Sequence, residues 1–150
     1  MFAPQPAVVV AEMLRVLKPG GTIAFSTWPP DMLVGRMFGM VSKYMPPPPP
    51  GAAPPPQWGD PNIIKQRLGD AVKDLFFYEV TMQVPALSPQ HFRNHTERTA
   101  GPLVKLVEML SANDPAKLAE FRAQYDALAT EYFDGNTMKQ DFLITRATKI

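Results

Sequence analysis

A helix, a proline–glycine turn and an apolar strand follow one another within the first 28 residues, and this succession constrains the fold more than any other feature. Apolar residues recur at helical spacing over residues 6–17, and Pro6 suits a first turn, where its missing N–H costs nothing. Pro19 prevents the helix from continuing, and Gly20 and Gly21 permit a reversal. The uncharged, β-rich residues 22–28 then predict a strand covered on both faces. Such a succession is typical of the middle of an α/β fold.

The same residues carry a resemblance to a known family. Residues 12–21 read E-M-L-R-V-L-K-P-G-G. They resemble the E-x-x-R-V-L-K-P-G-G segment of class I S-adenosylmethionine-dependent methyltransferases, most closely the ubiquinone/menaquinone C-methyltransferase-like group. In that family the segment ends the fourth helix and opens the fifth strand. The resemblance implies an α/β fold with a partial Rossmann-like sheet, made of the last three strands with the final one antiparallel, and with helical insertions.

The family's cofactor-binding segments are not found in this sequence. No G-x-G-x-x-G-like cluster follows a predicted strand, and no acidic ribose partner follows one. We therefore assign no cofactor-binding residue and no catalytic residue. S-adenosylmethionine is expected only where a complementary N-terminal half supplies its site, so the isolated chain is expected to be inactive.

Composition narrows the class of protein further. The 150 residues suit one domain, residues 1–150, and an apolar content of 45% allows a core. The formal net charge is +1 without a basic stripe, so nucleic-acid binding is not expected. No apolar run approaches the roughly 20 residues of a membrane span, and no signal peptide is evident, so a cytoplasmic location is the default. The absence of cysteine excludes disulfides and thiolate metal sites.

Residues 32–45 predict a helix that is apolar on nearly all sides. Such a helix must be covered, either as a core or interface helix or as a lid over an acceptor pocket, for which flexible methionines are suited. Arg36 and Tyr44 on this segment are candidate substrate-binding residues under the second interpretation.

A proline-rich segment, residues 46–56, follows this helix. Consecutive prolines favour the extended polyproline II conformation, so the segment is predicted to be a stiff connector inside the domain. It could alternatively bind an aromatic groove of a partner. Trp58 is expected to anchor its end by packing.

The rest of the chain alternates predicted strands and helices. Asp60-Pro61 should open a short helix, and residues 75–84 give the strongest strand signal. Helical stretches are predicted at 90–99 and 103–110, and the best amphipathic helix follows Asp114-Pro115. Residues 138–148 after a D-G-N turn predict the last strand, so the order is strand, helices, strand, helical insertion, strand.

Two groups of side chains are candidate substrate contacts. His91, His95 and Arg98 share one face of a predicted helix, but no H-E-x-x-H pattern or matching carboxylate set accompanies them, so we expect an acceptor-pocket contact or a solvated face and no metal site. Ser26 and Trp28 lie at the carboxyl end of the first strand, the end at which open α/β sheets bind ligands. Simple packing explains these two residues equally well.

Two functions from different classes fit these observations. The first is the acceptor-side portion of a small-molecule methyltransferase. The second is a non-enzymatic, methyltransferase-derived module that oligomerises and binds a partner or an apolar small molecule. In both, the first strand lacks a neighbour on one edge, and an open apolar edge promotes pairing. The expected partner is a second copy, giving a homodimer, or a complementary N-terminal methyltransferase half.

Overall fold

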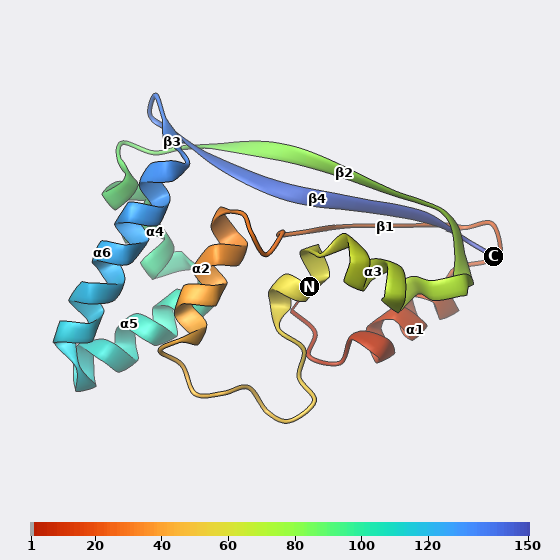
Figure 1. Cartoon of the computed structure of the whole chain (residues 1–150), viewed down its shortest axis with the longest axis horizontal. Coiled ribbons are helices and arrows are strands. Elements are labelled where there is room, and N and C mark those ends of the chain that lie inside the picture. Colours follow the sequence, from red (N-terminus) through yellow and green to blue (C-terminus); the bar gives the residue numbers. More distant parts are fainter. Residues whose placement is uncertain (1) are drawn as a thin grey trace. The chain divides into compact units, whose positions relative to one another are not determined.

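The computed structural model describes residues 2–150 and combines helices with one sheet (Figure 1). The chain divides into two compact units. The first unit holds the chain up to Gly35 together with Pro48–Val80 and Asp141–Ile150, and the second holds Arg36–Pro47 and Thr81–Gln140. None of the helices in the described residues is long and apolar enough to cross a membrane.

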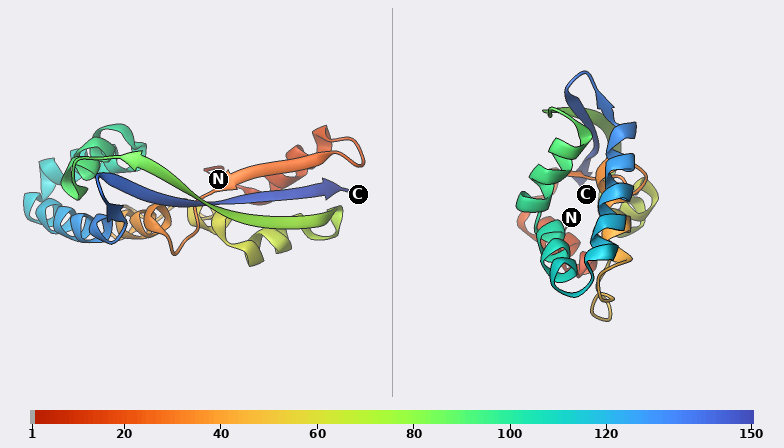
Figure 2. Two further views of the ribbon diagram at one scale, coloured as in Figure 1. Left: turned by 90° about the horizontal axis from the view of Figure 1, so that it is seen from above. Right: turned by 90° about the vertical axis from the view of Figure 1, so that its left-hand side faces the viewer.

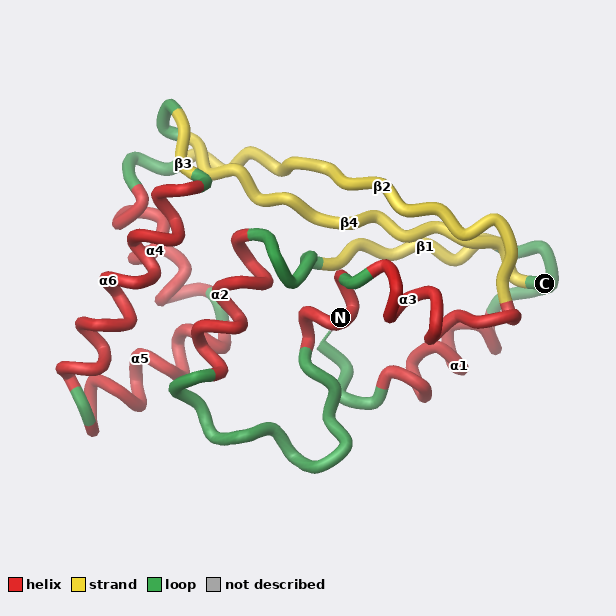
Figure 3. Tube along the Cα trace, in the orientation of Figure 1, coloured by secondary structure: helices red, strands yellow, loops and turns green. Residues whose placement is uncertain are grey.

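The sheet consists of four strands within the described residues, in the order β1-β4-β2, with a short β3 that pairs with β4. Their bounds are Thr22–Thr27 for β1, Val72–Pro85 for β2, Phe133–Asp134 for β3 and Thr137–Lys149 for β4. The pairing of β1 with β4 is antiparallel, in a register that runs from Thr22↔Thr148 to Thr27↔Leu143. Figures 2 and 3 show β4 between β1 and β2, which leaves β1 and β2 at the two edges.

Two helices of the first unit, α1 (Pro6–Val16) and α3 (Pro61–Leu68), cover one face of the sheet. Val10 of α1 and Ile64 of α3 join Ile23 and Ala147 of the strands in one buried apolar cluster. The expected helix start at Asp60 is confirmed, because the Asp60 carboxylate accepts hydrogen bonds from the backbone N–H groups of the first helical turn.

The C-terminal end of the proline-rich segment is anchored in the core of this unit. A short 3₁₀ helix, η1 (Pro55–Gly59), ends the segment, and Trp58 within it is buried in the apolar cluster, as predicted. The ring of Phe25 packs edge-on against Trp58 at 5.9 Å between centroids. The five prolines at residues 46–50 are exposed and lie outside any helix or strand, whereas residues 55–56 belong to η1 instead of an extended connector.

The second unit is built on the helices α4 (Pro89–Thr99), α5 (Gly101–Asn113) and α6 (Pro115–Glu131), each of which packs against the other two. The apolar stripe predicted for α6 is buried, including Leu118, Phe121, Tyr125 and Leu128. Ser88 and Asp114 cap the starts of α4 and α6 with side-chain hydrogen bonds to backbone N–H groups.

Two further expectations need correction. The helix predicted for residues 32–45 is shorter: α2 spans Leu33–Ser42, and residues 43–45 form turns. The strand β1 is covered on one face only, since Ile23 and Thr27 are buried while Thr22, Ala24 and Ser26 are exposed. The absence of charged residues in β1 did not distinguish a strand buried on both faces from one whose second face carries small uncharged side chains.

Candidate functional site

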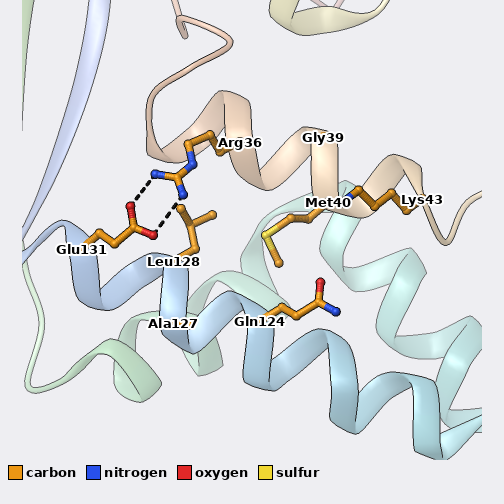
Figure 4. A pocket seen from close by; sticks show the side chains of 8 residues that line it. All are labelled: Arg36, Gly39, Met40, Lys43, Gln124, Ala127, Leu128 and Glu131. Carbon is orange, nitrogen blue, oxygen red and sulfur yellow. Dashed lines mark hydrogen bonds and ion pairs between the residues drawn. The ribbon is translucent and has the colours of Figure 1, made fainter.

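An open groove of about 500 Å³ lies between α2 and α6 in the second unit (Figure 4). One wall comes from α2 and the other from the C-terminal half of α6. The residues that line it are Arg36, Gly39, Met40, Lys43, Gln124, Ala127, Leu128 and Glu131. A volume of this size lies within the range of about 300–1,000 Å³ that small-molecule sites occupy.

Arg36 closes one end of the groove by an ion pair with Glu131. Its two terminal nitrogens donate to the two carboxylate oxygens at 2.6 and 3.0 Å, and one of them also donates to the Tyr132 hydroxyl at 3.2 Å. These hydrogen bonds raise the pKa of Arg36 and lower the pKa of Glu131. The candidate Arg36 therefore lines a groove, but its guanidinium is already engaged within the protein.

The middle of the groove is apolar. Met40 and Leu128 face each other across it in Figure 4, and Ala127 adds a small side chain. Gly39 widens the opening, because nothing lies within 4 Å of the position that a Cβ would occupy there. The groove therefore has an apolar middle between two polar ends, of which Arg36 forms one and Lys43 the other.

A second groove of about 470 Å³ lies on the other side of Lys43. Its lining residues are Lys43, Tyr44, Met109, Leu110, Asn113, Asp114 and Lys117. The candidate Tyr44 belongs here, and its ring packs edge-on against Phe121 at 5.6 Å between centroids. Lys43 thus contributes to both grooves.

The candidates on α4 lie on one exposed face, as their spacing predicts. The Nδ1 atom of His91 accepts a 3.4 Å hydrogen bond from the backbone N–H of Leu87, and His95 is exposed. The Nε atom of Arg98 donates to the Asn94 carbonyl oxygen at 3.0 Å. Among residues 2–150, no group of three or more histidine, aspartate or glutamate side chains is placed to hold a metal ion. A role for these three residues in substrate binding remains a prediction.

Ser26 and Trp28 belong to the first unit. Ser26 is exposed on β1, and Trp28 packs edge-on against Phe142 at 6.1 Å between centroids. A cavity of about 320 Å³ lies just beyond Trp28 and includes Pro29, Gly59 and Glu79 in its lining. A Cβ on Gly59 would overlap the carbonyl of Trp28, so only glycine permits this close approach of the two backbones.

A buried ionic cluster in the second unit was not found by sequence reasoning. Glu97 accepts hydrogen bonds from Arg93 at 3.0 Å and from Arg122 at 2.7 and 3.2 Å, and Arg93 also donates to Asp126 at 2.7 Å. Burial raises the pKa of Glu97, but hydrogen bonds from Arg122 and Arg93 outweigh it and leave the pKa below its ordinary value. Arg93 and Glu97 are spaced four residues apart, which is the local signal that could have indicated part of this cluster.

Beside this cluster, Tyr125 forms a hydrogen bond with Thr96 at 3.2 Å between the two hydroxyl oxygens. Burial raises the pKa of Tyr125 to about 12. The tyrosine therefore stays neutral near neutral pH, and its position inside the helical unit indicates a packing role.

No protein-family model matches the chain. Two proteins described as uncharacterized, one from Mycobacterium tuberculosis and one from Mycobacterium bovis, are each 27% identical to it over 150 residues. A second uncharacterized protein of Mycobacterium tuberculosis is similar at the same identity. Each alignment covers 99% of this chain and 54% of the relative, so the chain spans about half the length of the curated relatives it matches.

Proposed function

We propose that the chain is the acceptor-side portion of a small-molecule methyltransferase that uses S-adenosylmethionine. The observation that carries the proposal is the position of β4, the last strand, between β1 and β2 and antiparallel to β1. The family resemblance implies an antiparallel last strand beside the strand that follows the K-P-G-G turn. The turn itself joins α1 to β1, as the resemblance also implies.

In this proposal the chain contributes acceptor contacts and not the cofactor site. Methyl transfer is an in-line displacement at a sulfonium, to which a protein contributes mainly proximity, orientation and in some cases a base. Five residues of the second unit are proposed acceptor contacts: Arg36, Tyr44, His91, His95 and Arg98. Ser26 and Trp28 are proposed for the same role in the first unit. A second, cofactor-binding half completes the enzyme, and the mycobacterial relatives carry about as much sequence again outside the matched part.

Calorimetric titration with S-adenosylhomocysteine tests the proposal. The 150-residue chain alone should give no saturable heat, because it carries no glycine-rich loop after a strand. A full-length mycobacterial relative should bind the same ligand with a micromolar dissociation constant. Failure of the relative to bind would overturn the methyltransferase proposal, and micromolar binding by the chain alone would overturn its division into two halves.

The second candidate function is a non-enzymatic module that binds a partner or an apolar small molecule as an oligomer. The exposed aromatic residues on β2 favour it: Phe76 and Tyr78 are each 58% exposed and stack on each other at 6.5 Å. A glycine-rich strand–loop–helix in the unmatched part of the relatives would favour the enzyme, and its absence there would favour the module.

A further inference from the structure

The charged side chains that line the groove between α2 and α6 do not balance one another, and this imbalance indicates the charge of a suitable ligand. Its lining includes two cations, Arg36 and Lys43, and one carboxylate, Glu131. Each oxygen of this carboxylate accepts one hydrogen bond from Arg36. The lining therefore carries one positive charge that no carboxylate of the groove balances, at the Lys43 end.

Lys43 is also the cation of the second groove that is left without a partner. Lys117 in that groove pairs with Asp114 at 3.2 Å. Within residues 2–150, no ion pair or hydrogen bond of the Lys43 ammonium is found. Lys43 is exposed, so an anion can reach its ammonium group directly from solvent.

The apolar middle of the groove suits a flexible hydrocarbon body. Met40 and Leu128 offer adaptable and branched aliphatic surface, and Gly39 leaves the entrance open. Gln124 belongs to the α6 wall, and its amide nitrogen donates a 2.9 Å hydrogen bond to the Glu120 carboxylate. In Figure 4 the amide oxygen of Gln124 points toward α2.

We propose that this groove binds an aliphatic monocarboxylic acid. The carboxylate would pair with Lys43, and the hydrocarbon chain would lie over Met40 and Leu128 toward the Arg36–Glu131 pair. One unbalanced positive charge matches a monoanion, and a hydrocarbon chain matches the apolar middle. All lining residues come from α2, the turn after it and α6, so the proposal does not depend on the methyl-transfer function.

Titration of the ¹⁵N-labelled chain with decanoate, below its micelle concentration, tests the assignment. Saturable shifts are expected at amides of α2 and α6, with decanol and decylamine binding at least tenfold more weakly. Lys43→Gln should weaken decanoate binding by about tenfold, the value of one charge-assisted hydrogen bond. Lys105→Gln removes an exposed lysine of α5 and serves as the matched control, with no change expected.

A second variant tests the hydrocarbon site independently of charge. Gly39→Leu places a side chain in the open space of the groove and should abolish binding, while Gly39→Ala should retain most of it. Far-UV circular dichroism checks that both variants keep their helices. Equal binding of decanol and decanoate, unchanged affinity in Lys43→Gln, or shifts confined to Phe76 and Tyr78 on β2 would overturn the proposal. These outcomes are separate from the cofactor titration, which reports on the proposed function.

Discussion

At the residue scale, Glu97 is the one buried charged residue among residues 2–150. It holds Arg93 of its own helix and Arg122 of α6 together. A carboxylate removed from water is stable there only because both guanidinium groups satisfy its oxygens. The cluster therefore ties α4 to α6 inside the second unit and makes that unit sensitive to a single substitution.

Replacing this carboxylate by an amide gives the first prediction. Glu97→Gln should lower the free energy of unfolding by about 2 kcal/mol, because Arg93 and Arg122 lose their shared counter-charge in a part-buried site. Urea denaturation followed by circular dichroism measures the change. The control Glu108→Gln alters an exposed glutamate of α5 and should leave stability within about 0.5 kcal/mol. Equal effects of the two substitutions would contradict the role of the cluster.

The lowered pKa of Glu97 gives a second prediction. A group whose folded pKa lies below its unfolded value stabilises the fold above the unfolded pKa and loses that contribution as the pH falls through the folded pKa. The ordinary pKa of glutamate is 4.5, so stability should be level above this pH and fall below it. Unfolding midpoints in urea between pH 7 and pH 3 would show the decline, and Glu97→Gln should show a shallower one. An identical acid profile for the two proteins would contradict the assignment.

Two glycines of α2 give a third, paired prediction. A Cβ on Gly35 would overlap the carbonyl oxygen of Pro29, whereas a Cβ on Gly39 would meet nothing within 4 Å. Gly35→Ala should therefore destabilise the protein by about 2 kcal/mol. Gly39→Ala should stabilise it by about 0.5–1 kcal/mol, because alanine loses less backbone entropy in a helix. Thermal unfolding of both variants measures the difference, and a stable Gly35→Ala variant would show that the backbone at Pro29 shifts freely.

At the element scale, the sequence predicted the secondary structure where the pattern was local. The stripe on α6, the cap at Asp60 and the D-G-N turn before β4 each depend on neighbouring residues, and each is present. The exposed face of β1 was not predicted, because strand composition does not reveal what covers a sheet. The groove between α2 and α6 could not be predicted from the sequence either, because Arg36 and Glu131 lie 95 residues apart in it.

The proline-rich segment allows a fourth prediction. Lys43 is exposed, lies beyond the end of α2 and precedes the five exposed prolines, so the backbone there can enter a protease site. Trypsin under native conditions should cleave after Lys43 before it cleaves elsewhere, giving two large fragments by mass spectrometry. Lys105 and Lys117 are exposed but helical and should be cut later. Early cleavage at either of them would indicate that the second unit opens before this segment is attacked.

At the scale of the whole molecule, the open edges of the sheet decide how copies of the chain interact. The strand β1 pairs with β4 on one side only, and β2 forms the opposite edge. The helix α2 offers less apolar surface than its sequence indicates, because Leu33, Met37 and Val41 are buried and its other large apolar residues are half-buried. Self-association is therefore expected to use strand edges more than this helix.

The fifth prediction is a homodimer at micromolar concentration, measured by sedimentation equilibrium. The unpaired edge of β1, a strand without charged residues, offers its backbone N–H and C=O groups to a second copy, and two-fold symmetry is the commonest way for such contacts to close. Ala24→Lys places a charge on the exposed face of β1 and should produce a monomer with unchanged circular dichroism, since edge lysines oppose strand pairing.

The matched control for this experiment is Ala123→Lys, which adds the same charge on the exposed side of α6 and should leave the dimer intact. A monomeric wild-type protein would contradict the prediction and would mean that the β1 edge is tolerated in water without a partner. A dimer that survives Ala24→Lys would instead move the interface to the other edge, where Phe76 and Tyr78 are exposed. Because the β1 edge is also where a cofactor-binding half would pair under the proposed function, addition of that half should compete with the homodimer formed through β1.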